Sequence, residues 1–201
     1  TLVFIDSTQG WLVTDNGTQD TAPTAKYVTA TGGTITCSGD YRIHTFTGPG
    51  AFCVSNAGNA AGSNTVDYLV VAGGGGGGGA ITTSAGAGGA GGYRESPGTA
   101  SGSYTVSPRG ASPAVALPVS VQPYTVTVGG GGTAGQGVTP GNGTPGGIGS
   151  NSVFSTITAA GGGTGSREVC AGGNGGSGGG GGGVGTGAPA GGSGNTPPTN
   201  P

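Results

Sequence analysis

Of the 201 residues, 54 are glycine and 13 are proline, while only 6% are charged and the formal net charge is −2. A charge this weak excludes an electrostatic nucleic-acid binder and a polybasic membrane-surface protein, because both need clustered Lys and Arg side chains. No window of the sequence approaches the roughly 18 consecutive apolar residues of a membrane-spanning helix. We therefore expect neither a nucleic-acid partner nor membrane insertion.

Glycine is unevenly distributed along the chain. Nine of the 54 glycines lie within residues 1–72, and the other 45 lie beyond them, whereas the large apolar residues show the opposite bias. The sequence therefore predicts two domains, a β-rich N-terminal region over residues 1–65 and a glycine-rich domain over residues 66–201. Residues 195–201 look like an interruption, so we expect the second domain to be truncated.

Short apolar runs separated by turn residues follow one another through the first region. Asn16-Gly17 supplies the positive φ that a tight hairpin needs. In residues 41–47, Tyr41 and Ile43 alternate with His44, which we expect on the solvent side of a strand. No helical periodicity is present. Strands are predicted over residues 2–5, 10–14, 26–31, 34–37, 41–47 and 52–55.

One motif occurs three times in the second region: an apolar, β-branched string that leads directly into glycine. The strings are residues 66–71, 124–128 and 153–158, and they precede the glycine runs 73–79, 129–132 and 161–163. We call them the lead-in strings. The distance between the copies is not constant, which argues against a solenoid.

The glycine runs have two possible structures. A helix or an ordinary strand is unfavourable, because glycine loses the most backbone entropy and buries no side chain, and collagen needs glycine at every third position. The runs are therefore either flexible linkers or a bundle of polyproline-II helices, whose backbones lack Cβ atoms and can approach one another closely enough to hydrogen-bond. The lead-in strings favour the bundle. The predicted fold is a mainly β N-terminal region plus a glycine-rich polyproline-II helix bundle, with essentially no α-helix.

Several strings resemble a known family. Residues 66–79 and 88–95 resemble the glycine-rich domain of bacteriophage tail-fibre proteins, notably from phages of marine bacteria and cyanobacteria, and so do residues 40–48, 116–130 and 152–158. The organisation is more distantly similar to the tip adhesins of T-even-like phages, whose glycine-rich motifs form a polyproline-II sandwich with variable loops. A similar lead-in precedes glycine runs in certain animal receptor tyrosine kinase ectodomains, so the resemblance bears first on the fold.

The resemblance implies a non-enzymatic virion tail-fibre protein, exposed to the extracellular medium, that acts as a distal host-recognition module. Its expected partners are a host cell-surface molecule, protein or glycan, and other virion tail or fibre subunits; fibre proteins of this kind are commonly homotrimers. The alternative is a purely structural fibre or spacer protein that contacts only other subunits. A cell-surface glycine-rich protein of a microbe is a third class.

Residues suited to catalysis or metal binding are scarce. His44 is the only histidine, so a catalytic triad would have to use it, and the acidic residues lie mostly beside turns, where Asp bonds its own backbone. Cys37, Cys53 and Cys170 lack the spacing of a zinc site. A bridge between Cys37 and Cys53 is geometrically possible, but free buried thiols are favoured for a protein that assembles in a reducing cytoplasm. We expect no enzyme, no cofactor and no metal.

Recognition is expected in the loops that join the glycine runs, because loops on a rigid scaffold can vary without disturbing its core. The candidate loops are residues 80–85, 93–112 and 165–171. Arginine and tyrosine are enriched at contact hot spots. The same side chains could instead cover the flank of the bundle or keep a nearly neutral surface soluble. The candidate receptor-binding residues are Tyr93, Arg94, Tyr104, Arg109 and Arg167.

Overall fold

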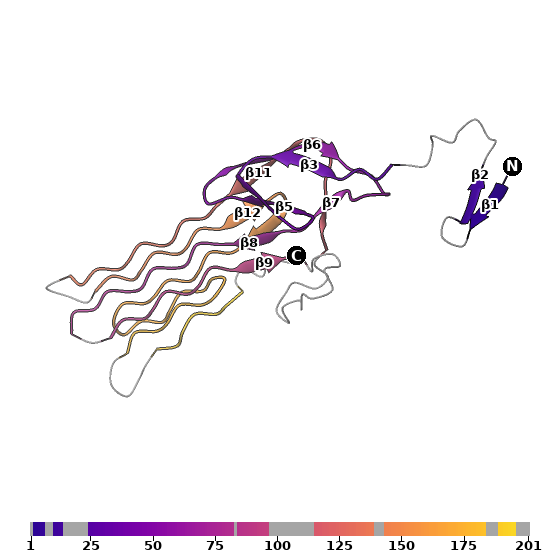
Figure 1. The fold of residues 1–201 in the computed structure, drawn as a ribbon. Helices are drawn as coiled ribbons and strands as arrows, with labels where there is room; N and C mark the ends of the chain where they lie inside the picture. Colours follow the sequence, from indigo (N-terminus) through magenta and orange to yellow (C-terminus); the bar gives the residue numbers. More distant parts are fainter. Residues whose placement is uncertain are drawn as a thin grey trace.

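The computed structural model of the chain describes residues 2–6, 10–13, 24–82, 84–96, 115–138, 143–183 and 189–195. Within these ranges the fold is mainly β-sheet, and no residue is in an α-helix. The coarse prediction, a mainly β fold with essentially no helix, is therefore confirmed for the part of the chain that can be described. Figure 1 shows the sheets at one end of the molecule and the glycine runs extending from them.

Two hairpins form in the N-terminal region where apolar runs were predicted. Strand β1 (Leu2–Asp6) pairs antiparallel with β2 (Gly10–Val13), and β4 (Thr34–Ser38) pairs antiparallel with β5 (Tyr41–Thr45). The second hairpin turns at Gly39, whose φ of 56° is the left-handed conformation that glycine adopts without a steric penalty. The predicted turn at Asn16-Gly17 lies outside the described residues.

The main sheet has five strands, each antiparallel to its neighbour, in the order β13-β12-β11-β6-β3. Strands β3 (Val28–Thr31) and β6 (Gly50–Ala57) come from the N-terminal region. Strands β11 (Pro123–Thr127), β12 (Ser152–Phe154) and β13 (Ile157–Ala159) come from the glycine-rich region. Strands from both sides of residue 65 thus share one sheet.

The lead-in strings are the strands from which the glycine runs begin. The first contributes to β7 (Thr65–Val66) and β8 (Leu69–Val71), which pair with β10 (Leu117–Pro118) and β9 (Tyr93–Glu95) respectively. The second is β11. The third is a hairpin, β12 and β13, that turns at Ser155 with a φ of 54°.

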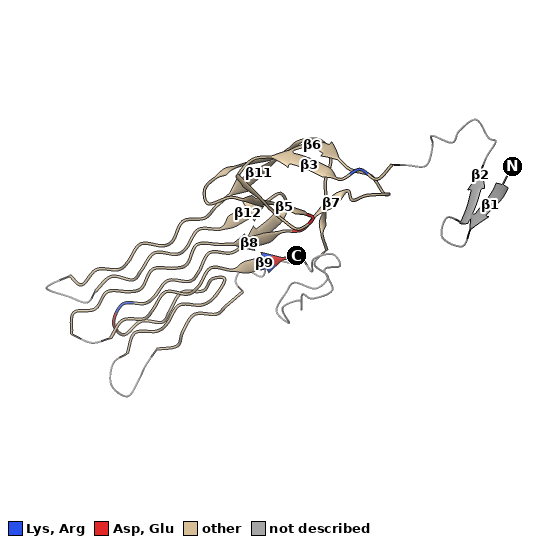
Figure 2. Cartoon of the chain, in the orientation of Figure 1, with Lys and Arg blue, Asp and Glu red and all other residues tan. Residues whose placement is uncertain are grey.

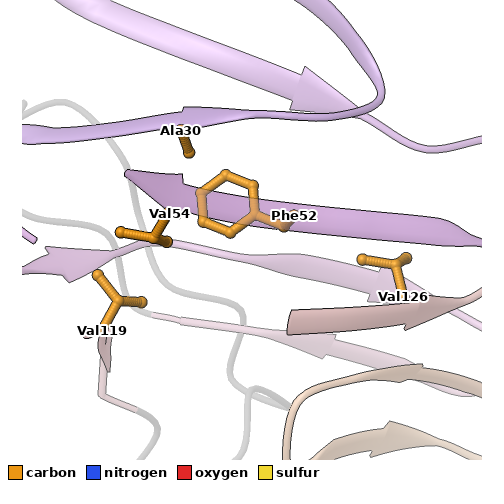
Figure 3. Close-up of a cluster of buried hydrophobic side chains, with 5 residues drawn as sticks. All are labelled: Ala30, Phe52, Val54, Val119 and Val126. Carbon is orange, nitrogen blue, oxygen red and sulfur yellow. The ribbon is translucent and has the colours of Figure 1, made fainter. Parts of the chain in front are cut away.

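A small apolar core lies under the five-stranded sheet. Phe52 is its largest member, and the ring of Phe154 meets it edge-on at 5.8 Å between ring centroids. Phe154 also packs against a second cluster, formed by Val70, Ala72 and Ala159, at the roots of the glycine runs. The two cores are therefore joined through one aromatic side chain. Figure 3 shows the buried members of the first cluster: Ala30, Phe52, Val54, Val119 and Val126.

The position of His44 differs from the prediction. Its Nδ1 lies 2.8 Å from the carbonyl oxygen of Gly32, and its ring meets Phe52 at 5.0 Å between centroids with planes 89° apart. The prediction of a solvent-facing His44 is wrong. Alternation in a strand shows which residues share a face but not which face packs inward, and here Tyr41 and Ile43 are on the outside, 50% and 44% exposed.

All three cysteines are free thiols. Cys37 is exposed on β4, Cys53 is half-buried on β6, and Cys170 is half-buried between glycine runs. The thiols are free, as the sequence favoured, but Cys37 is exposed whereas buried thiols were expected.

The glycine runs lie side by side (Figure 1). Backbone hydrogen bonds that recur every three residues join them. In the run 72–79, the N–H groups of Gly73, Gly76 and Gly79 donate to carbonyl oxygens in residues 144–150, at 2.8–3.0 Å. The N–H groups of Gly75 and Gly78 donate to a different neighbour, residues 86–92. Its carbonyl groups accept from two further runs, within residues 132–135 and 162–165. The run 72–79 is thus bonded to four others.

Missing side chains make this packing possible. A Cβ atom on Gly76 would overlap the carbonyl oxygen of Thr133, and one on Gly73 would overlap that of Gly130. A Cβ on Gly77 would meet nothing nearer than 3.8 Å. Backbone atoms of one run therefore occupy the space that a side chain of the next would need, at some positions of the run but not at all of them.

Candidate functional site

The glycine runs turn back in loops at the end of the molecule farthest from the sheets (Figure 1). The N–H of Gly183 donates to the carbonyl of Ser84 at 3.1 Å, and the N–H of Gly182 donates to that of Cys170 at 3.0 Å. The loops are therefore in contact with one another. We call their described residues the distal end: 80–82, 84–85, 136–138, 143–144, 166–171 and 182–183.

A buried carboxylate ties two of these loops together. Glu168 is only 4% exposed. Its Oε1 accepts hydrogen bonds from the backbone N–H groups of Ile81 and of Thr82, the latter at 3.0 Å, and its Oε2 lies 3.5 Å from the hydroxyl of Thr82. Hydrogen bonds to a charged acceptor are stronger than those between neutral groups. Glu168 therefore fixes the loop after run 72–79 against the loop after run 161–165.

The loop of Glu168 presents two exposed side chains. The N–H of Cys170 donates to the carbonyl of Arg167 at 3.4 Å, which closes a tight turn. Within it Val169 has a φ of 56° and is 47% exposed. Arg167 is also exposed. The turn thus directs a cation and an aliphatic side chain outward while the carboxylate between them is buried.

The surface of the distal end is almost uncharged, and exposed polar side chains (Thr82, Ser84, Gln136 and Thr144) lie among exposed aliphatic ones. Ile81 is 37% exposed and Val138 is 48% exposed, in addition to Val169. Arg167 and Glu168 are the only charged residues among the described residues of the distal end, and no aromatic residue is present there. Figure 2 shows how sparse charge is over the described chain.

Two of the predicted site residues lie at the opposite end of the glycine runs, in β9 (Figure 1). The guanidinium of Arg94 donates to the carbonyl of Tyr93 at 3.1 Å and to Oδ1 of Asn195 at 3.2 Å. The hydroxyl of Tyr93 donates to the carboxylate of the buried Glu95 at 2.6 Å. The bond from Arg94 to Asn195 links β9 to the last described segment, residues 189–195.

A small polar network supports the same strands. The hydroxyl of Ser96 donates to Oδ1 of Asp67 at 2.8 Å and accepts the N–H of Tyr68 at 3.0 Å. Burial raises the pKa of Tyr68, and the Asp67 carboxylate acts in the same direction, while the nearby Arg94 cation opposes them. Burial therefore favours the neutral phenol of Tyr68.

The structure brings together some of the predicted loops and separates others. Loops 80–85 and 165–171, with Arg167, meet at the distal end, whereas Tyr93 and Arg94 lie beside the sheets. Tyr104 and Arg109 lie outside the described residues. Sequence reasoning missed Glu168 as a loop-binding residue and Val138 as an exposed one. The interruption of a glycine run by Gln136 and Val138 was the available signal for the second.

An open groove of about 400 Å³ lies on the five-stranded sheet. It carries no charged side chain. At this groove the phenol oxygen of Tyr124 accepts hydrogen bonds from Gln122 and Ser120, and these bonds lower the pKa of Tyr124. The lining residues are Gln122, Pro123, Tyr124, Thr125, Thr127, Val153, Ser155 and Thr156.

Two kinds of feature are missing from the described ranges. No cluster of three or more His, Cys, Asp or Glu side chains is arranged to hold a metal ion there. Nor do these ranges contain a helix with the length and apolar character needed to cross a bilayer.

Comparison with known proteins gives one match. The family model of the glycine-rich domain matches residues 47–200, which is more than half of the chain. No curated protein and no solved structure matches the sequence. The match begins within the N-terminal β region and continues through the glycine runs. It therefore covers parts of both regions, and the five-stranded sheet likewise takes strands from both. The chain belongs to the family of proteins with this glycine-rich domain.

Proposed function

We propose that the glycine runs are polyproline-II helices packed into a bundle. Two observations support this. The hydrogen bonds between runs recur with a spacing of three residues, and a polyproline-II helix has three residues per turn and no internal hydrogen bonds, so its amides are directed toward neighbours. The only glycines with left-handed φ among the described residues are Gly32, Gly33, Gly39 and Gly58, all outside the runs.

We further propose that the chain is a non-enzymatic recognition module of a phage virion fibre, and that its distal end binds a molecule on the host cell surface. The observation that carries this proposal is the gathering of contacting loops at the far end of a scaffold whose hydrogen bonds are made by backbone groups. Loop side chains can change on such a scaffold without altering the packing that positions them. The phage assignment rests on the resemblance of the strings in residues 40–158.

Under this proposal the five candidate residues are not equally suited to contact a receptor. Arg167 lies at the distal end and is exposed, so it is the receptor contact we favour among the five candidates. Tyr93 and Arg94 are held in hydrogen bonds near the sheets. Tyr104 and Arg109 stay predictions.

The test uses fluorescently labelled full-length chain and a panel of marine bacterial and cyanobacterial strains. We expect saturable binding to whole cells of some strains. A variant in which residues 167–170 are replaced by Gly-Ser-Gly-Ser should lose that binding while keeping the circular dichroism of the native chain. Absence of binding to every strain, or equal binding by the replacement variant, would contradict the proposal.

A structural role in contact with other virion subunits is the second candidate. One observation favours it: the outer face of the β4–β5 hairpin exposes Tyr41 and Ile43, and clustered exposed apolar residues mark association sites. A homotrimer formed through this face should be seen by analytical ultracentrifugation and should dissociate when Ile43→Ser is introduced. A monomer at all concentrations would argue against this role.

A further inference from the structure

One left-handed backbone position among the described residues is occupied by a residue type that rarely adopts this conformation. Four glycines adopt a positive φ, as expected in a chain so rich in glycine. Three other described residues do so: Ser155, Val169 and Asn195. Asparagine tolerates this conformation and serine is small, but a β-branched side chain there is a genuine outlier. Val169 is thus the one residue of the three that the backbone conformation itself disfavours.

The packing around Val169 gives no structural reason for a valine. The side chain is 47% exposed and belongs to neither apolar core. Its two neighbours hold the conformation: Glu168 is anchored by its bonds to the loop at Ile81 and Thr82, and the N–H of Cys170 closes the turn onto Arg167. A glycine at position 169 would satisfy the same backbone without strain.

Strained positions of this kind persist where the surroundings over-determine them, and they cluster at functional sites. We infer that Val169 is the specificity-determining contact of the distal end, and that its partner is a protein surface with an apolar patch beside a carboxylate. This inference rests on the proposed recognition function. Ile81 and Val138 are the other exposed aliphatic side chains of the distal end, and Arg167 supplies a guanidinium that pairs with a carboxylate.

A protein partner fits this surface better than a glycan does. Sugar rings are commonly held by stacking on aromatic side chains, and the described residues of the distal end include none. The centre of a protein–protein interface is more apolar than the rest of the surface, and arginine is enriched at such interfaces. Host proteins exposed on the cell surface are therefore the class that we assign.

The experiment compares Val169→Gly with the unchanged chain on a strain that binds the latter. We expect the variant to melt at the same temperature or a higher one, because the strain is relieved, and to bind cells about tenfold more weakly, because a central aliphatic contact is lost. A residue with only a structural role would not combine lower affinity with unchanged or higher stability. The matched control is Val121→Gly, at a 64% exposed valine beside β11, which should leave cell binding unchanged.

Treatment of the cells tests the partner class. Protease treatment should abolish binding of the unchanged chain, and periodate oxidation of glycans should not. Equal binding by Val169→Gly and the unchanged chain would overturn the role of Val169, and loss of binding after periodate alone would overturn the protein assignment. Either result leaves the proposed recognition function standing, whereas that function fails only if the unchanged chain binds no strain or the loop replacement has no effect.

Discussion

At the scale of single residues, the glycines of one run have different roles although the sequence letters are identical. Gly76 faces the backbone of another run at a position where no Cβ fits, whereas a Cβ on Gly77 would be in ordinary van der Waals contact with the carbonyl oxygen of Gly86 at 3.8 Å. The identity of the neighbour, and not the composition of the run, decides which glycines are required. This distinction cannot be made from a string of seven identical letters.

We predict that Gly76→Ala destabilises the chain by about 3 kcal/mol or more, because the added methyl forces two backbones apart. Gly77→Ala is the matched control in the same run. It should be neutral or stabilising by up to about 1 kcal/mol, since alanine restricts the unfolded chain. Urea unfolding followed by circular dichroism measures both, and equal effects of the two variants would contradict the close packing of Gly76.

Glu168 allows a second prediction at this scale. Glu168→Gln keeps one acceptor oxygen but loses the charge and the second acceptor, so we expect a loss of about 1–2 kcal/mol. Hydrogen exchange at the amides of Ile81 and Thr82 should accelerate in particular. The neighbouring Arg167→Gln, at an exposed side chain, should change stability by less than about 0.5 kcal/mol. Unchanged exchange at both amides would show that the carboxylate does not hold this loop.

At the scale of elements, an outer run differs from a central one. In the run 129–135, a Cβ atom on Gly129, Gly132 or Gly135 would overlap the backbone of a neighbouring run. Thr133 and Ala134, which lie between the last two of these glycines, are exposed. We expect the exposed side chains of this run to keep another glycine run from approaching as closely as the inner neighbours do. The edge of the bundle would then be protected by a few methyl groups, as the edges of sheets are protected by charges or prolines.

Removing these side chains should expose an edge of the bundle at which two molecules can associate. We predict that the double variant Thr133→Gly and Ala134→Gly associates into dimers or larger species, measured by sedimentation velocity over a range of concentrations. Ala72→Gly with Ala160→Gly adds the same number of glycines at buried positions, where no outer surface changes, and it should sediment like the unchanged chain. Identical sedimentation of both variants would show that the edge is not guarded in this way.

Part of this element-level picture was accessible from the sequence. The strands of residues 28–57 and the strand character of the lead-in strings follow from β-branched runs between turn residues, and the structure confirms them. The inward position of His44 was missed, because the fold of the hairpin depends on the turn at Gly32 and Gly33 and on Phe52 beneath it. Glu168 was missed because its partners are backbone amides 86 and 87 positions away.

At the scale of the whole molecule, the sheet joins regions that composition separates. Strand β6 pairs on one side with β3 and on the other with β11, which follows it by more than sixty residues. Phe154 packs with both apolar clusters. Composition changes at residue 72, but the hydrogen bonds and the core cross that position.

We therefore predict that a fragment ending at residue 65 does not fold by itself, because β6 loses one neighbour and the core loses Val126 and Phe154. Its amide NMR spectrum should have the narrow dispersion of an unfolded peptide. A second fragment, residues 24–195, is the control and should give a dispersed spectrum. A dispersed spectrum from the short fragment would show instead that residues 1–65 are an independent domain.

The central place of run 72–79 also has a consequence for biosynthesis. All four of its neighbours are later in the chain, the first at residues 86–92 and the last around residues 161–165, so this run leaves the ribosome well before its last partner exists. Contacts between distant residues form slowly, and most nascent chains would risk aggregation during such a delay through exposed apolar side chains. A glycine run that has not yet met its partners presents no such side chains. The composition that permits the final packing should therefore also limit aggregation of the nascent chain.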